Sequence, residues 1–194
     1  MNDTIHLQPP LILDTIWKST RDSGFPMASD DKTGSLLRTL AATKPNGAIL
    51  ELGTGTGLSA AWIIAGMHAK ASLISVDNDA GFSAIAQTHL GSDPRVTFYV
   101  EDGGLFLEHL RGQTFDMIFA DTWSGKYTHL EEALDLLAIG AIYVIDDMLP
   151  QPNWPEGHAS KVSALITQLE SRADLAVTKL AWATGIIICT KTAV

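Results

Sequence analysis

The chain has 194 residues, of which 46% are hydrophobic and 18% are charged, the composition of a globular domain large enough to bury its own core. Its 13 Lys and Arg residues against 22 Asp and Glu residues give a formal net charge of −9 without a basic cluster, which argues against a nucleic-acid partner. No uncharged apolar stretch is long enough to cross a membrane and no secretory signal is visible, so we expect a cytoplasmic protein without a membrane partner.

The first 46 residues predict two helices, Leu11–Arg21 and Thr33–Thr43, joined by a connection at residues 24–31. This piece is long enough to pack over a ligand but too short for an elaborate substrate-binding cap. Residues 47–194 read as the core of the same domain, since no linker, repeat or low-complexity tract separates the two parts. We therefore predict a single domain over 1–194.

Strand-like and helix-like segments alternate from residue 47 onward. The expected strands are Ala48–Leu52, Ser72–Asp77, Val96–Val100, Phe115–Ala120, Ala141–Asp146, Leu175–Leu180 and Gly185–Thr190, and the expected helices are Ser59–Met67, Asp79–Leu90, Leu105–Arg111, His129–Leu137 and Ser160–Ser171. This alternation predicts an α/β fold with a seven-stranded, mostly parallel sheet covered by helices on both faces. Four residues join the last two strands, too few for a parallel crossover, so one of the two runs antiparallel.

A glycine-rich turn follows the first expected strand, in the segment Glu51-Leu-Gly-Thr-Gly-Thr-Gly57. Gly53, Gly55 and Gly57 leave room for a ligand against the backbone, and the helix after them turns its N-terminus toward an anionic or polar group. Many tight turns carry glycine for backbone reasons alone. The third glycine comes one residue earlier than in the dinucleotide-binding fingerprint, which argues against that cofactor.

The second expected strand ends at Asp77, followed by Asn78 and Asp79. A carboxylate at this place in an open α/β sheet can accept hydrogen bonds from both hydroxyls of a ribose. Alternatively, Asp77 only caps the helix that begins near Ala80. The two motifs at this spacing favour a nucleoside-containing ligand over either structural explanation.

Acidic residues also lie at the ends of the other core strands. They are Glu51, Asp77, Glu101, Asp102, Asp121, Asp146 and Asp147. Ligands of open parallel sheets bind beyond the carboxyl ends of the strands, so these side chains are candidate site residues. Helix capping is a plausible alternative for Asp79 and Asp102, but no helix starts directly after Asp121 or Asp146.

The glycine turn with its preceding Glu resembles the first motif of the S-adenosylmethionine-dependent methyltransferases. The stretch Phe115–Tyr127 and the strand Ala141–Asp147 are similar to those of the catechol and caffeoyl-CoA O-methyltransferase group, and residues 27–34 resemble the group's N-terminal segment. The resemblance implies S-adenosylmethionine as cofactor, held at its amino-acid end by Glu51 and Ser59, at its ribose by Asp77 and at its adenine by Asp102. Asn78 and Asp121 are expected beside the cofactor.

The same resemblance implies a divalent cation, usually Mg²⁺, bound by Asp121, Asp146 and Asp147. Two departures concern the chemistry. The group has a lysine three residues after the strand-four Asp, where this chain has Ser124, with Lys126 two positions later. The group's Asn of the metal pair is Asp147, which still offers oxygen to a hard cation but adds a negative charge.

Without the group's lysine, the acceptor proton goes to Lys126, Asp147 or His158, or the cation acidifies the acceptor enough to need no base. The last option is favoured, so Lys126→Ala and His158→Ala are each expected to lose less than about tenfold in rate. Asp121, Lys126 and His158 are accordingly the candidate catalytic residues.

Residues 148–158 form a proline-rich loop beyond the fifth core strand. Trp154 and His158 are expected to line an acceptor pocket with Trp17, Met27, Trp123 and Tyr127; alternatively, the tryptophans only seal the core. Cys189 reads as a small buried hydrophobe in the last strand.

The function predicted from the sequence is methyl transfer to a small-molecule acceptor, most simply to a hydroxyl with help from the cation. Metal-independent N- or C-methylation is the alternative among enzymes, and a catalytically silent cofactor-binding module is the alternative outside them. Aminopropyl transfer is less favoured, because Glu51 and Ser59 suit an intact amino-acid end. The oligomeric state stays open, with a homodimer as one option.

Overall fold

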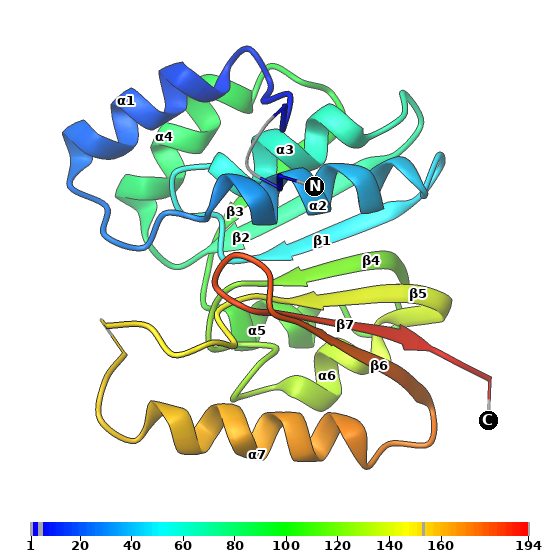
Figure 1. Cartoon of the computed structure of the whole chain (residues 1–194). Helices are drawn as coiled ribbons and strands as arrows, with labels where there is room; N and C mark the ends of the chain where they lie inside the picture. The colour runs from blue at the N-terminus through cyan, green and yellow to red at the C-terminus, as the bar shows by residue number, and fades with distance from the viewer. Residues whose placement is uncertain (1, 4–5, 153, 194) are drawn as a thin grey trace.

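The computed structural model describes residues 2–3, 6–152 and 154–193, and it shows a seven-stranded sheet between two layers of helices (Figure 1). The order of the strands in the sheet is β3-β2-β1-β4-β5-β7-β6. The strands are β1 (Ala48–Leu52), β2 (Ser72–Asp77), β3 (Val96–Val100), β4 (Phe115–Ala120), β5 (Leu137–Ile145), β6 (Leu175–Leu180) and β7 (Ile186–Lys191). The predicted α/β fold is confirmed.

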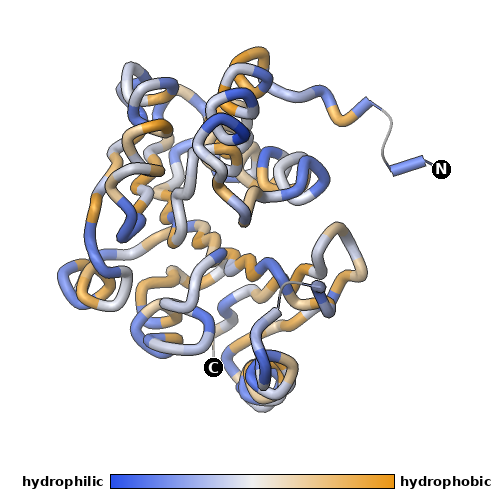
Figure 2. The backbone as a smooth tube through the Cα atoms, turned by 90° about the vertical axis from the view of Figure 1, so that its left-hand side faces the viewer, coloured by the Kyte–Doolittle hydropathy of each residue, from blue (hydrophilic) through white to orange (hydrophobic). Residues whose placement is uncertain are grey.

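In the described part of the chain, four helices lie on one face of the sheet and three on the other; Figure 1 shows the two layers. The first layer holds α1 (Leu13–Ser23), α2 (Asp31–Ala42), α3 (Leu58–Gly66) and α4 (Ala80–Leu90), and the second holds α5 (Gly103–His109), α6 (Leu130–Asp135) and α7 (His158–Glu170). In Figure 2 hydrophobic and hydrophilic positions are interspersed along the backbone. Helix α3 is the exception among the helices in burial, because residues 58–64 are all buried and it packs against α2.

Two hydrophobic cores follow from the alternation of side chains along the strands. Leu50 and Leu52 of β1 point into the core beneath α5, α6 and α7, whereas Ile49 points into the core beneath α1 to α4. The second core includes Ile16 of α1 and Leu37 of α2, both fully buried. The N-terminal helices therefore share a core with the strands.

The sheet is parallel except at β7, which pairs antiparallel with both β5 and β6. The predicted reversal near the C-terminus is thus confirmed, and the reversed strand lies inside the sheet, between β5 and the edge strand β6. Strand β5 begins at Leu137, earlier than predicted, and α6 ends at Asp135. The apolar run at this point suits a helix or a strand, and the pairing of Leu137 with Phe115 of β4 decides for the strand.

The carboxyl ends of the parallel strands meet at one edge of the sheet, where the chain turns into loops and helix N-termini (Figure 1). Asp79 caps α4 by accepting hydrogen bonds from the amides of Gly81 and Phe82. Asp102 caps α5 in the same way, so the capping explanation holds for both acids. No helix in the described part of the chain is both long and apolar enough to span a bilayer.

Candidate functional site

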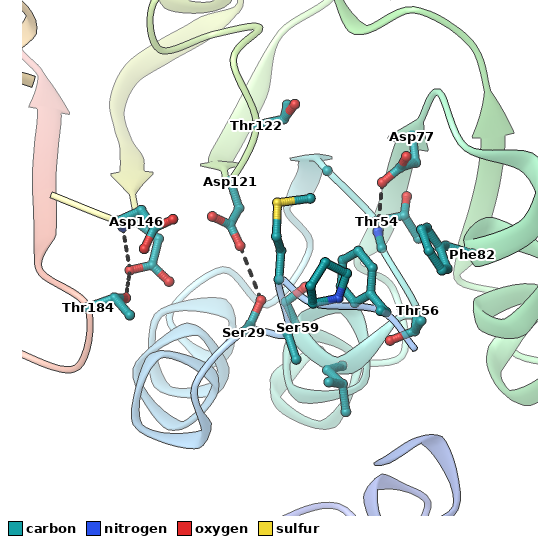
Figure 3. A pocket seen from close by; sticks show the side chains of 18 of the residues that line it. Ser29, Thr54, Thr56, Ser59, Asp77, Phe82, Asp121, Thr122, Asp146 and Thr184 are labelled. Carbon is teal, nitrogen blue, oxygen red and sulfur yellow. Dashed lines mark hydrogen bonds between the residues drawn. The ribbon is translucent and has the colours of Figure 1, made fainter. Parts of the chain in front are cut away.

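A cavity of about 480 Å³ lies beyond the carboxyl ends of β1, β2, β4 and β5 (Figure 3). The predicted site residues that line it are Gly53, Gly55, Ser59, Asp77, Asn78, Asp121, Asp146, Asp147 and His158. In Figure 3, Asp77 and Phe82 lie at one end of the cavity, and Asp121 and Asp146 lie at the other. The cavity therefore joins the glycine turn to the acidic cluster, two features about seventy residues apart in the sequence.

The glycine turn is held by the carboxylate at the end of β2. One oxygen of Asp77 accepts a hydrogen bond from the amide of Gly55 at 2.7 Å, and the other accepts one from the amide of Asp79 at 2.9 Å. The backbone of Gly55 has a φ of +49°, and a Cβ there would lie 2.9 Å from the ring of Phe25. Asp77 keeps free lone pairs for hydroxyl donors, as a ribose-binding carboxylate needs.

Gly57 and Asp102 lie outside the cavity lining. Gly57 has a φ of +91°, and a Cβ there would lie 2.8 Å from Cβ of Ala86, so this glycine allows α3 to approach α4. The exposed Asp102 uses one carboxylate oxygen to cap α5. Their predicted cofactor contacts stay predictions, and the contacts that the structure does show for both residues are structural.

Glu51 is fully buried beneath the glycine turn. Its Oε2 accepts a 2.5 Å hydrogen bond from Ser75, while Oε1 has no hydrogen-bond partner among the described residues. Burial raises the pKa of Glu51 to about 7, and the Ser75 hydroxyl offsets this only in part. The carboxyl of Glu51 thus has a spare oxygen and lies behind Ser59, which lines the cavity. This arrangement fits the ammonium end of a bound amino acid.

The acidic cluster is hydrogen-bonded to two residues that were not among the predicted site residues. Ser29, from the connection between α1 and α2, donates a 3.2 Å hydrogen bond to Asp121. Thr184, from the link between β6 and β7, donates a 2.5 Å hydrogen bond to Asp146, which also accepts one from the amide of Asp147 (Figure 3). These contacts fix the direction of both carboxylates.

Lys126 lies behind the cluster and does not line the cavity. Its side chain is only 5% exposed, its Nζ donates a 3.0 Å hydrogen bond to the carbonyl of Asp146, and it lies 3.9 Å from Oδ1 of Asp121. Burial and the neighbouring Asp146 raise the pKa of Asp121 to about 8, against the lowering effect of Lys126. Burial also raises the pKa of Asp146.

A tight turn after β4 explains how Lys126 reaches the acids although the lysine of the resembled group stands two positions earlier. Gly125 has a φ of +82°, and its carbonyl accepts a 2.5 Å hydrogen bond from the buried hydroxyl of Tyr143. Ser124 points elsewhere, because its Cβ lies against Gly103 at the start of α5. The turn therefore places residue 126, and not residue 124, against the acidic cluster.

The predicted metal site does not match this arrangement. Among the described residues, no group of three or more His, Cys, Asp or Glu side chains is placed to hold a metal ion. Asp146 is engaged by Thr184, Asp121 by Ser29, and the ammonium of Lys126 supplies positive charge beside both acids. Divalent cations such as Mg²⁺ need several free oxygen ligands around one point, so the donor set does not fit the predicted cation.

Aromatic side chains form the wall of the cavity next to the acids. Trp123, Trp154, Met27 and His158 line it, as predicted, whereas Trp17 and Tyr127 do not. His158 is the first residue of α7, and its Nε2 lies 3.1 Å from the hydroxyl of Tyr127. Burial lowers the pKa of His158, which keeps the imidazole neutral at neutral pH.

The strand order, the glycine turn and the cavity at the carboxyl edge together define the Rossmann-like methyltransferase fold. The chain belongs to the methyltransferase domain family, whose sequence profile matches residues 50–148.

Proteins similar to this chain come from several bacteria. A provisionally named O-methyltransferase of Mycobacterium ulcerans (strain Agy99) is 27% identical over 148 residues, which cover 72% of this chain and 66% of the relative. The crystal structure of the O-methyltransferase TomG from Streptomyces achromogenes, in complex with SAM, superimposes with a TM-score of 0.84 at 22% identity, over 98% of this chain and 94% of TomG. An O-methyltransferase from Bacillus cereus in complex with SAH gives a TM-score of 0.85 at 16% identity, over 97% and 94%.

Proposed function

We propose that this protein transfers the methyl group of S-adenosylmethionine to a hydroxyl group of a small-molecule acceptor. The observation that carries the proposal is the single cavity that joins the glycine turn and Asp77 to the acids Asp121, Asp146 and Asp147. The cofactor is bound at the first end, with Glu51 and Ser59 at its ammonium and Asp77 at its ribose. Family membership and the cofactor complexes of TomG and the Bacillus cereus protein support this cofactor.

The reaction requires little covalent help from the protein. The acceptor oxygen attacks the methyl carbon in line with the sulfonium, the carbon–sulfur bond breaks as the carbon–oxygen bond forms, and the acceptor proton leaves to a nearby base. Catalysis is therefore mostly positioning, together with removal of that proton. Asp121, Asp146 and Asp147 line the acceptor end of the cavity together with His158. The negative charge of the chain supports a small molecule over a nucleic acid.

The direct test is incubation of the protein with methyl-labelled cofactor and a panel of hydroxylated, aminated and carbon-acid acceptors, followed by mass spectrometry. Labelled methyl ethers are the expected products. Labelled amines or carbon-methylated products would replace the proposal by the alternative chemistry. Binding of S-adenosylhomocysteine without turnover of any acceptor would point to a catalytically silent module.

Asp77→Ala is expected to weaken binding of S-adenosylhomocysteine by about tenfold to a hundredfold, because a charged acceptor of two hydroxyl hydrogen bonds is lost. Isothermal titration calorimetry measures the change. Asp102→Ala provides the comparison, since Asp102 also follows a strand and caps a helix but lies outside the cavity. Unchanged affinity in Asp77→Ala would contradict the ribose assignment, and an equal loss in Asp102→Ala would support the predicted adenine contact.

Binding of S-adenosylhomocysteine is expected to tighten by about tenfold between pH 6 and pH 8. Glu51 has its pKa raised to about 7, so the carboxylate that pairs with the ligand ammonium is mostly protonated at the lower pH and mostly ionised at the higher. Calorimetry across this range gives the profile. Glu51→Gln removes the titrating group and should flatten it; an equally steep profile in that variant would assign the pH dependence to another group.

A further inference from the structure

Lys126 is a buried cation with a defined set of neighbours. Its ammonium has three donors, of which one is used by the carbonyl of Asp146 at 3.0 Å and another faces Oδ1 of Asp121 at 3.9 Å. The ring of Tyr127 lies 5.9 Å from Nζ and closes another side. A lysine is seldom buried unless its charge is compensated, so the acids and the lysine form one electrostatic unit.

A tight turn sets the direction of the Lys126 side chain. The positive φ of Gly125 and the hydrogen bond from Tyr143 fix the turn that directs residue 126 inward. A Cβ on Gly125 would lie 2.6 Å from Leu52 and 2.7 Å from the Tyr143 hydroxyl, so the turn is packed tightly into the core of the sheet. Asp121, Asp146 and Asp147 line the cavity and Lys126 does not, so the ammonium leaves the cavity side of the acids open to an acceptor.

We propose that the ammonium of Lys126 takes the place of a divalent cation, so that the acidic cluster binds and activates the acceptor without a metal ion. The inference rests on the proposed function in placing the acceptor at this cluster. Lys126 acts through Asp121 and Asp146 and is therefore a positioning residue. One fixed positive charge compensates the carboxylates, while the serine and threonine contacts orient them.

The test measures the binding of Mn²⁺ in two ways, by calorimetry and by the loss of the free-ion signal in electron paramagnetic resonance. The wild-type protein is expected to show no binding of Mn²⁺ that depends on Asp121, so wild type and Asp121→Asn should give the same titration. Lys126→Ala uncovers the acids and should bind one additional Mn²⁺ at least about tenfold more tightly than wild type. Adding Asp121→Asn to Lys126→Ala should abolish the gain, and Lys126→Arg, which keeps the charge, should not show it.

Two results would overturn the inference: one Mn²⁺ bound by wild type and lost in Asp121→Asn, or no gain of binding in a folded Lys126→Ala variant. Binding of S-adenosylhomocysteine reports that the variant is folded. Should Lys126→Ala not fold, Lys126→Gln takes its place in the titration, because glutamine keeps a long polar side chain without the charge. The readout uses no methyl transfer. Failure of wild type to methylate any acceptor therefore counts against the proposed function, whereas the Mn²⁺ titrations decide on the role of Lys126.

Discussion

Replacing Lys126 by methionine is expected to lower kcat at pH 7 by about 10²-fold to 10³-fold, the range of a lost proton acceptor. The ammonium lies beside Asp121 and Asp146, and it lowers the pKa of both against burial. Without that charge the two carboxyls hold their protons to still higher pH, so the ionised fraction that can take the acceptor proton at pH 7 falls below its wild-type level. The kcat profile should shift to higher pH in the variant, which a merely structural role of Lys126 would not produce.

The burial of Lys126 beside the acids favours this larger loss over the expectation, drawn from the sequence, that its loss costs less than about tenfold. That expectation stands for His158→Ala, which serves as the matched control. The imidazole lies at the same cavity, but its Nε2 faces Tyr127 and its Nδ1 is buried without a hydrogen-bond partner among the described residues, so neither nitrogen is set toward the acceptor end. A loss below tenfold in Lys126→Met, with an unshifted pH profile, would contradict the role assigned to the lysine.

The strands were predictable because hydrophobic runs of strand length are bounded by glycine, asparagine and aspartate in this sequence. Five of the predicted strands match the structure to the residue, including Ala48–Leu52 and Phe115–Ala120. The start of β5 was not predictable, because the segment Leu134-Asp-Leu-Leu-Ala138 suits both a helix and a strand locally. Only the pairing with β4, a contact distant in sequence, resolves that ambiguity.

The site was predictable where a residue stands directly at a strand end. Asp77, Asp121 and Asp146 all reach the cavity for this reason. The contacts of Ser29 and Thr184 were not predictable, because both residues lie in connections whose paths depend on the packing of distant elements. The sequence held one signal for each residue. Ser29 lies within residues 27–34, which resemble the N-terminal segment of the catechol and caffeoyl-CoA O-methyltransferase group, and Thr184 directly precedes Gly185.

Lys126 shows most clearly what the sequence leaves open. The spacing between Asp121 and Lys126 does not determine whether the lysine side chain points toward the acids, since position within a loop says little about direction. The structure shows that Gly125 and Tyr143 set that direction, and both signals are visible only once the turn is placed against β1 and β5. The same contacts make the turn sensitive to the smallest substitution.

Gly125→Ala is expected to lower the free energy of unfolding by about 3 kcal/mol or more. Part of the loss, about 1–2 kcal/mol, comes from the positive φ of +82°, which an alanine adopts only with strain. The rest, about 1–3 kcal/mol, comes from overpacking, because the added Cβ would lie 2.6 Å from Leu52 and 2.7 Å from the Tyr143 hydroxyl. Urea unfolding measures the change.

Gly140→Ala separates the two causes. Gly140 has nearly the same φ, +80°, but a Cβ there would meet none of the described residues within 4 Å, so only the backbone strain of about 1–2 kcal/mol is expected. Gly125→Ala should also lower kcat, since the turn that directs Lys126 toward Asp121 is displaced, whereas Gly140→Ala should leave kcat unchanged. Equal losses of stability in the two variants, or full activity of Gly125→Ala, would show that the packing of this turn does not hold the lysine in place.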